Sequence, residues 1–142
     1  MSIDNCVNGN CNFKPKALVI DDDHTQLDLS KLFFSYLGFS VDTVDDPAKI
    51  GAEVHDYDAV ISDTFGAGWY GPREVVSRLK ELNYRGVVLG NSSTPNPDVE
   101  RDWQVSGHSF VVKPMGMEGY KAQKTLLKQL IGCHCNPTNY KF

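Results

Sequence analysis

The chain has 142 residues, of which 41% are hydrophobic and 23% are charged. This length suits one globular domain that buries a core without a disulfide or a metal. The 14 Lys and Arg residues against 18 Asp and Glu residues give a net charge of −4, which argues against a generic nucleic-acid binder. No apolar run approaches the ~20 residues of a membrane span, and no secretory signal precedes Lys14. We therefore expect a cytoplasmic protein that contacts neither nucleic acid nor membrane.

Between two tails, at 1–14 and 133–142, short apolar runs alternate with helical patterns over residues 15–132. Continuous apolar runs of three or four residues are typical of strands that are covered on both faces. The expected elements are, in chain order, a strand at 17–20, a helix around 29–37, a strand at 41–44, a short helix at 47–54, a strand at 59–61, a helix around 72–82, a strand at 87–89, a helix at 97–105, a strand at 110–112 and a helix around 126–131.

Apolar residues at helical spacing mark the buried face expected of the longer helices. Gly38, Pro72 and Gly132 suit the end of the first, the start of the third and the end of the last helix. The expected stripes are Leu29, Phe33, Tyr36 and Leu37 in the first helix, Val75, Val76, Leu79 and Leu82 in the third, and Leu126, Leu127, Leu130 and Ile131 in the last. Trp103, in the fourth helix, suits either a core position or an exposed contact face.

Strands that alternate with helices imply right-handed parallel crossovers. The sequence therefore predicts an α/β fold with a doubly wound, five-stranded parallel sheet and five helices.

In such a sheet, ligands bind beyond the carboxyl ends of the strands. Asp21-Asp22-Asp23 follows the first run, Asp63 follows the third, Asn91-Ser92 follows the fourth and Lys113-Pro114 follows the fifth. Clustered carboxylates repel one another unless a cation joins them, and oxygen ligands of this kind favour Mg²⁺ over zinc. A metal, a lysine and a hydrogen-bond donor around a free carboxylate are suited to phosphoryl transfer.

With these residues in place, the segment 15–132 resembles the receiver domain of two-component response regulators. Asp21-Asp22 matches the acidic pair of the family, Asp63 its phosphoacceptor and Lys113-Pro114 its conserved dipeptide, while Gly71 stands at the position of its loop glycine. The resemblance implies a flavodoxin-like fold. Because no output domain is expected after Gly132, it also implies a stand-alone, chemotaxis-type regulator or a phosphorelay intermediate.

The resemblance also implies roles for individual residues. Asp22 and Asp63 would bind Mg²⁺ directly, Asp21 would act through water, and the carbonyl of Phe65 would complete the protein ligands. Asp63 would take a phosphoryl group from a phosphohistidine on a sensor histidine kinase or a histidine phosphotransfer protein, and Lys113 would then pair with a phosphoryl oxygen. Such a domain is a switch with Mg²⁺-dependent self-phosphorylation and self-dephosphorylation rather than a turnover enzyme, and its output is an unknown protein target.

Three features depart from the family pattern. Ungapped counting places Asn91 where the family has Ser or Thr, and Ser92 reaches this position only with a one-residue shift. Phe110 stands at the position of the family's switch aromatic, and either Asn91 or Ser92 would couple the phosphoryl group to it. Gly66-Ala67 replaces the usual Met-Pro and is followed by Trp69-Tyr70. The segment between Val44 and Asp63 is about two residues short, which predicts a clipped second helix.

Two other functions remain open at this point. A pseudo-receiver that binds partners without phosphorylation is favoured by Asn91 and by the unusual loop after Asp63. A haloacid-dehalogenase-type phosphatase with Asp21 as its nucleophile fits the D-x-D-x-T pattern that ends at Thr25. That chemistry needs an acidic pair after Lys113, where Glu118 is the only carboxylate side chain, and it leaves Asp63 without a role.

All four cysteines lie in the tails, which should be neighbours because the first strand begins and the last helix ends at the same edge of this fold. In a reducing compartment, free thiols are the leading interpretation. A second metal site or a redox site is the alternative, formed by Cys6, Cys11, Cys133 and Cys135.

Overall fold

The computed structural model describes residues 6–7, 10–11, 14–63, 72–92, 97–113 and 116–132. Its elements are β1 (Cys6–Val7), β2 (Asn10–Cys11), β3 (Lys16–Ile20), α1 (His24–Tyr36), β4 (Ser40–Val44), the 3-10 helices η2 (Pro47–Lys49) and η3 (Ala52–Asp56), β5 (Ala59–Asp63), α2 (Pro72–Glu81), β6 (Val87–Ser92), α3 (Pro97–Val105), β7 (Ser109–Val112) and α4 (Gly116–Ile131). Several residues of the sequence analysis lie outside the described ones, namely Phe65, Gly66, Ala67, Trp69, Tyr70, Gly71, Pro114, Cys133 and Cys135.

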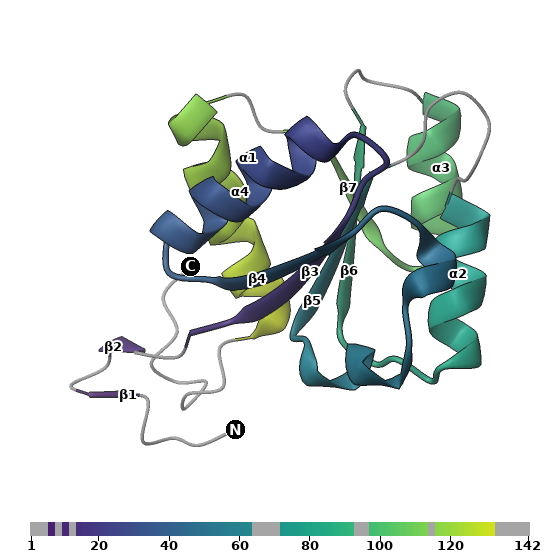
Figure 1. Cartoon of the computed structure of the whole chain (residues 1–142), viewed down its shortest axis with the longest axis horizontal. Helices are drawn as coiled ribbons and strands as arrows, with labels where there is room; N and C mark the ends of the chain where they lie inside the picture. Colours follow the sequence, from purple (N-terminus) through teal and green to yellow (C-terminus); the bar gives the residue numbers. More distant parts are fainter. Residues whose placement is uncertain are drawn as a thin grey trace.

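Five parallel strands form the central sheet, in the order β4-β3-β5-β6-β7. Helices α1 and α4 cover one face, and α2 and α3 cover the other (Figure 1). The predicted doubly wound, five-stranded parallel sheet is therefore confirmed. No helix in the described part of the chain combines the length and the apolar character that a membrane span requires.

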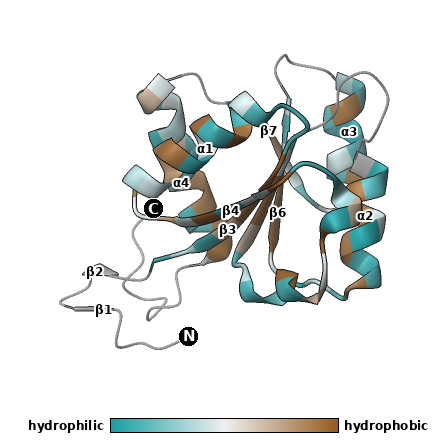
Figure 2. Cartoon of the chain, in the orientation of Figure 1, coloured by the Kyte–Doolittle hydropathy of each residue, from teal (hydrophilic) through white to brown (hydrophobic). Residues whose placement is uncertain are grey.

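Alternate residues of the strands fill two separate cores. In β3, Ala17 and Val19 pack in the cluster under α1 and α4, whereas Leu18 and Ile20 pack in the cluster under α2 and α3. Side chains of a strand alternate between its faces, so a strand that is covered on both faces is mostly apolar along its length. Figure 2 shows the result as continuous hydrophobic colour along the inner strands.

The predicted helix at 47–54 is wrong, and so is the count of five helices: the described residues hold four α-helices. Two 3-10 helices, η2 and η3, take the place of the predicted one. They are separated by Ile50 and Gly51, whose extended backbones interrupt any continuous helix. Buried Ile50 and Val54 still anchor the segment to the core under α2 and α3.

The apolar stripe predicted for α1 is also wrong in part. Leu29 and Tyr36 are exposed, at 38% and 76% of their surface, whereas Leu27 and Phe34 are the buried residues of the helix. Phe33 is half-buried and stacks on Tyr120 of α4 with ring centroids 4.8 Å apart. The buried face thus runs through Leu27 and Phe34, which stand seven residues apart, or about two helical turns. By contrast, Val75, Val76 and Leu79 of α2 are buried as predicted.

The first tail contains two short strands. Strands β1 and β2 form a separate antiparallel pair in which Cys6 stands opposite Cys11 and Val7 stands opposite Asn10.

Trp103 of α3 is fully buried, which settles its role in favour of the core. Its indole packs over β6 at Gly90, where an added Cβ would collide with the ring atoms Cε2 and Nε1. Gly90 is thus the place where the sheet lets a large aromatic approach the backbone closely.

We expect Gly90→Ala to destabilise the protein by about 1–3 kcal/mol, because the new methyl group overpacks against a rigid ring. Urea unfolding followed by circular dichroism measures this change. The same substitution in a Trp103→Phe background should cost less, because the smaller ring vacates part of the contact. An equal cost in both backgrounds would contradict the proposed clash.

Candidate functional site

Four strands bring polar side chains to one edge of the sheet. Asp21 directly follows β3, Asp63 is the last residue of β5, Asn91 lies near the end of β6, and Lys113 directly follows β7. Each of the four lies two residues after a strand residue that faces α1 and α4, namely Val19, Ile61, Leu89 and Val111, so it lies on the same face of the sheet. The expectation that residues far apart in the sequence meet at this edge is confirmed.

Lys113 joins two of the carboxylates directly. Its Nζ lies 2.8 Å from Oδ2 of Asp21 and 2.9 Å from Oδ1 of Asp63. All three side chains are nearly buried, with exposed fractions of 11% for Lys113, 6% for Asp21 and 8% for Asp63. The backbone N–H of Lys113 donates to the carbonyl of Ser92 at 2.7 Å, which fixes the start of the segment after β7.

Burial sets the electrostatics of this site. Burial raises the pKa of Asp21 from its ordinary 3.8 to about 6, and the charge of Asp63 adds to this effect. Hydrogen bonds from Lys113 and from the backbone N–H of Asp23 act in the opposite direction. For Lys113, burial opposes the charge, but the two carboxylates outweigh burial and hold its pKa above the usual value. The ammonium group therefore stays charged in the physiological range.

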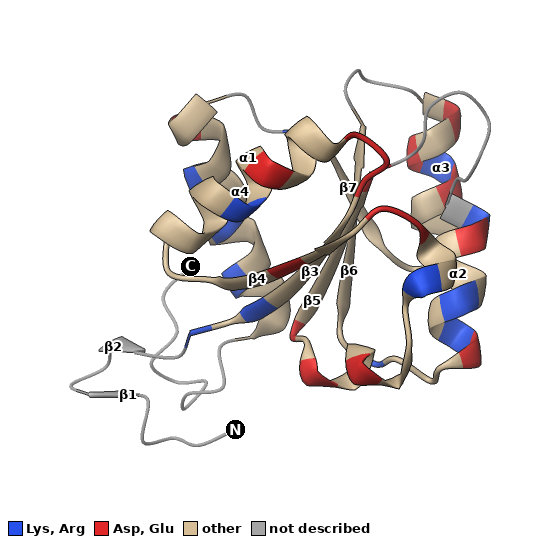
Figure 3. Cartoon of the chain, in the orientation of Figure 1, with Lys and Arg blue, Asp and Glu red and all other residues tan. Residues whose placement is uncertain are grey.

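Three carboxylates at this edge fit a divalent cation. Asp21, Asp22 and Asp63 each offer one oxygen, and these oxygens lie within 4.8 Å of one another. The donor set consists of oxygen alone, and Asp22 is exposed, which suits a hydrated Mg²⁺. Figure 3 shows the acidic residues along the segments that follow β3 and β4. The ligand predicted at Phe65 lies outside the described residues.

Asp23, the third member of the acidic run, has a structural role. It is the N-cap of α1, and its side chain accepts hydrogen bonds from the backbone N–H groups of Thr25 and Gln26. Such a cap stabilises the start of a helix. The acidic run therefore divides into two residues at the site, Asp21 and Asp22, and one residue that starts the helix.

The strand register distinguishes Asn91 from Ser92. Asn91 is the direct partner of Asp63 in the pairing of β5 with β6. Its neighbour Gly90 faces Trp103 on the α3 side, so alternation returns Asn91 to the side of Asp63 and places Ser92 on the opposite face. Asn91 is thus the residue beside the carboxylate, as ungapped counting predicted. Phe110 lies opposite Gly90 in β7 and packs, half-buried, against the cluster under α2 and α3.

Gln123 of α4 is a further residue of this site, and it is not among the residues predicted from the sequence. Its Nε2 donates to Oδ1 of Asn91 at 3.3 Å, and both side chains are buried. No partner is present for its Oε1 among the described residues. The signal was available in the sequence, because Gln123 lies between Tyr120 and Leu127 at helical spacing, as the polar member of the buried stripe of α4.

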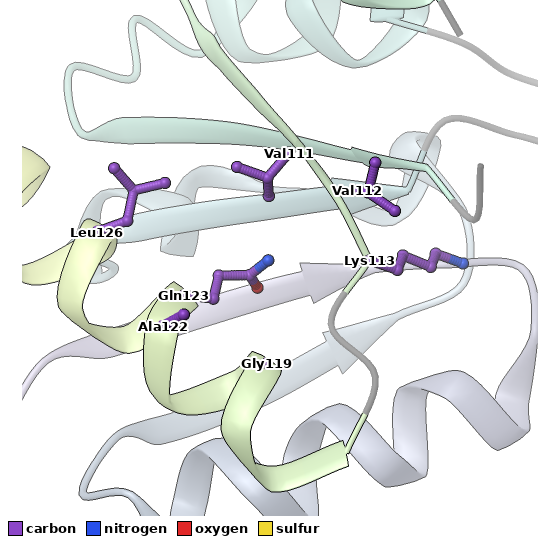
Figure 4. A pocket seen from close by; sticks show the side chains of 7 residues that line it. All are labelled: Val111, Val112, Lys113, Gly119, Ala122, Gln123 and Leu126. Carbon is purple, nitrogen blue, oxygen red and sulfur yellow. The ribbon is translucent and has the colours of Figure 1, made fainter. Parts of the chain in front are cut away.

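Beside these residues, a pocket of about 540 Å³ opens between β7 and α4. Apolar side chains line most of it, and Lys113 and Gln123 stand at its border. Figure 4 shows the Gln123 side chain extending from α4 toward the strands, whereas the Lys113 side chain runs past the end of β7 and away from Gln123.

Comparison with known proteins gives the same fold. No protein-family model matches the sequence, and neither does any curated protein. Solved structures do match. Chemotaxis protein CheY4 of Vibrio cholerae is 19% identical, with 81% of this chain and 99% of that chain covered and a TM-score of 0.70. A CheY-like receiver domain protein of Methanospirillum hungatei is 15% identical (83% of this chain, 97% of that chain, TM-score 0.67), and a chain of the CheX–CheY–BeF3–Mg²⁺ complex of Borrelia burgdorferi is 20% identical (80% of this chain, 87% of that chain, TM-score 0.66). The chain is similar to receiver domains, and the predicted resemblance is confirmed at the level of the fold.

The raised pKa of Asp21 predicts a pH-dependent stability in metal-free buffer. Between pH 3.8 and about 6, the folded state binds more protons at this carboxyl than the unfolded state. The contribution of Asp21 to the free energy of unfolding therefore falls as the pH rises through this window and is constant above it. We expect the free energy of unfolding of Asp21→Asn, relative to that of the native chain, to rise by about 1–3 kcal/mol as the pH increases across this window.

Urea unfolding at several pH values between 4 and 8 measures this difference. Asp28→Asn, which changes an exposed carboxylate of helix α1, is the control for the loss of one surface charge. A difference in stability between Asp21→Asn and the native chain that stays constant from pH 4 to pH 8 would contradict the burial penalty at Asp21.

Proposed function

We propose that the chain is a receiver that accepts a phosphoryl group on Asp63 from a phosphohistidine. The observation that carries the proposal is the ammonium group of Lys113, which bridges Asp63 and Asp21 at the carboxyl edge of a receiver-like sheet. A fold alone does not define a function, but this edge combines a nucleophilic carboxylate, a fixed cation and carboxylates that fit Mg²⁺.

Each part of the site has a role in the proposed reaction. An oxygen of Asp63 attacks the phosphorus, and the bond between phosphorus and the histidine nitrogen breaks. Lys113 lies within reach of Asp63 and stabilises the negative charge on the phosphoryl oxygens. Asp21, Asp22 and Asp63 would hold Mg²⁺, which neutralises charge on a transferring phosphoryl group.

Asn91 completes the surroundings of the phosphoryl group. Its Oδ1 accepts from Gln123, which leaves the Nδ2 amide group as the donor directed elsewhere. Asn91 pairs with Asp63 in the strand register, so in this proposal its Nδ2 donates to the phosphoryl group on Asp63. Asn91 therefore serves as the phosphoryl-facing residue in place of Ser or Thr, and movement of its amide couples the site to α4 through Gln123.

The proposed partners follow from this role. The phosphoryl donor is a sensor histidine kinase or a histidine phosphotransfer protein in the cytoplasm, and the output is altered affinity for another protein, with repacking of Phe110 as part of the switch. The Borrelia burgdorferi structure holds a CheY together with CheX, BeF3 and Mg²⁺, which supports both a metal and a protein partner. The net charge of −4 favours protein over nucleic acid as the target.

Incubation with acetyl phosphate and Mg²⁺ tests the proposal. We expect intact-protein mass spectrometry to show a gain of one phosphoryl group, because the small acyl phosphate can replace phosphohistidine as the donor. Peptide mapping should locate this group on Asp63. The gain should disappear with EDTA and in Asp63→Asn. Label on Asp21 with repeated turnover would instead support a phosphatase, and the absence of any label would support a pseudo-receiver.

A pair of neighbouring substitutions tests the role of Asn91. Loss of a hydrogen bond to a charged group costs about 1.5–3 kcal/mol, so Asn91→Ala should slow labelling roughly 10- to 100-fold. Ser92→Ala, on the opposite face of β6, is the matched control and should label at nearly the native rate. The reverse order of effects would assign the phosphoryl contact to Ser92.

A further inference from the structure

The N-terminal hairpin places two of the four cysteines directly opposite each other. Strands β1 and β2 pair antiparallel, and Cys6 is the register partner of Cys11. Only Asn8 and Gly9 separate the inner pair, Val7 and Asn10, in the sequence. Asn-Gly is the dipeptide most favoured in two-residue hairpin loops, so the sequence agrees with this register.

This register meets the distance requirement of a disulfide. Directly opposite residues of an antiparallel pair have Cα atoms about 4.5–5.5 Å apart, and disulfides join Cα atoms that are about 4.4–6.8 Å apart. Opposite positions also share one face of a two-stranded ribbon, because faces alternate along each strand. By contrast, Asn10 occupies the other face, so a cysteine there would be out of register with Cys6.

We propose that Cys6 and Cys11 form a reversible disulfide that closes the hairpin β1–β2. With oxidised glutathione as the oxidant, one cysteine thiolate attacks the glutathione disulfide and releases one glutathione thiolate. The second cysteine thiolate then attacks the protein sulfur of the mixed disulfide, which forms the bond between Cys6 and Cys11 and releases the second glutathione. The pair loses two electrons and two protons, and one molecule of oxidised glutathione becomes two of reduced glutathione.

The disulfide site is separate from the proposed phosphoacceptor. The hairpin lies by the beginning of β3 (Figure 1), whereas Asp21 follows the end of that strand. The proposal therefore does not rest on phosphorylation, and we expect acetyl phosphate labelling of Asp63 to be equal in the oxidised and reduced forms.

Trypsin cleavage makes the test specific to this pair. Cleavage after Lys16 releases residues 1–16 with Cys6 and Cys11, and cleavage after Lys128 and Lys141 releases residues 129–141 with Cys133 and Cys135. The full chain is equilibrated in glutathione buffers of increasing oxidation, quenched with acid, alkylated and digested without reductant. In oxidising buffers, we expect the peptide 1–16 to be lighter by the mass of two hydrogen atoms and to resist alkylation. Treatment with dithiothreitol should restore both its mass and its reaction with the alkylating reagent.

A variant with the cysteine moved by one position is the matched control. In Asn10→Cys combined with Cys11→Ser, the two cysteines are closer in sequence but on opposite faces. We expect this variant to need about tenfold more oxidised glutathione, relative to reduced, for half closure, because out-of-register thiols have a lower effective concentration. Equal closure in both chains would overturn the proposal.

Three other outcomes also contradict it. A cross-link between the two tryptic peptides would assign the redox pair to both tails. Stoichiometric zinc retained through gel filtration and lost in Cys6→Ser would assign the cysteines to a metal site. Four alkylated thiols at every glutathione ratio would show that the pair does not close.

Discussion

The contact between one buried ammonium group and two buried carboxylates determines how the rest of the site can work. Asp63 and Asp21 stand at the end of neighbouring strands, where burial penalises their charge, and Lys113 is the cation that joins them. Two adjacent carboxylates without such a cation would repel each other. Lys113 thus offsets the repulsion between Asp63 and Asp21, and it places a positive charge where the phosphoryl oxygens of the proposed reaction would arrive.

The parallel sheet is what makes this contact possible. Every strand of the sheet ends at the same edge, so Asp21, Asp63 and Lys113 meet although up to 92 positions separate them in the sequence. The alternation of side chains then decides which residues at this edge lie on the same face, because only alternate residues of each strand face α1 and α4. The same rule places Asn91 beside Asp63 and sends Ser92 to the other side. A one-residue shift of β6 would exchange these two residues.

Sequence reasoning succeeded where a pattern depends on local repetition. Doubly covered strands must be continuously apolar, so their positions and the parallel topology could be predicted, and with them the edge where Asp21, Asp63 and Lys113 meet. It failed where the result depends on packing between distant elements. The buried face of α1 passes through Leu27 and Phe34 because Tyr120 and Phe39 contact Phe34 there, and this arrangement is not visible in the spacing of apolar residues in α1.

Gln123 shows most clearly what packing adds to the site. A leucine at this place in the buried stripe of α4 would satisfy the core, whereas Gln123 brings a polar side chain whose Oε1 has no partner among the described residues. An unsatisfied buried acceptor costs about 1–3 kcal/mol, more than the hydrogen bond to Asn91 returns as a net gain. Stability alone therefore does not explain an amide at this position. The proposed role of Asn91 would explain it, because the hydrogen bond from Gln123 occupies Oδ1 of Asn91 and so leaves Nδ2 as the donor for the phosphoryl group. The receiver-like site of this chain is thus connected to α4 by a pair of amides, in addition to the proposed aromatic switch at Phe110.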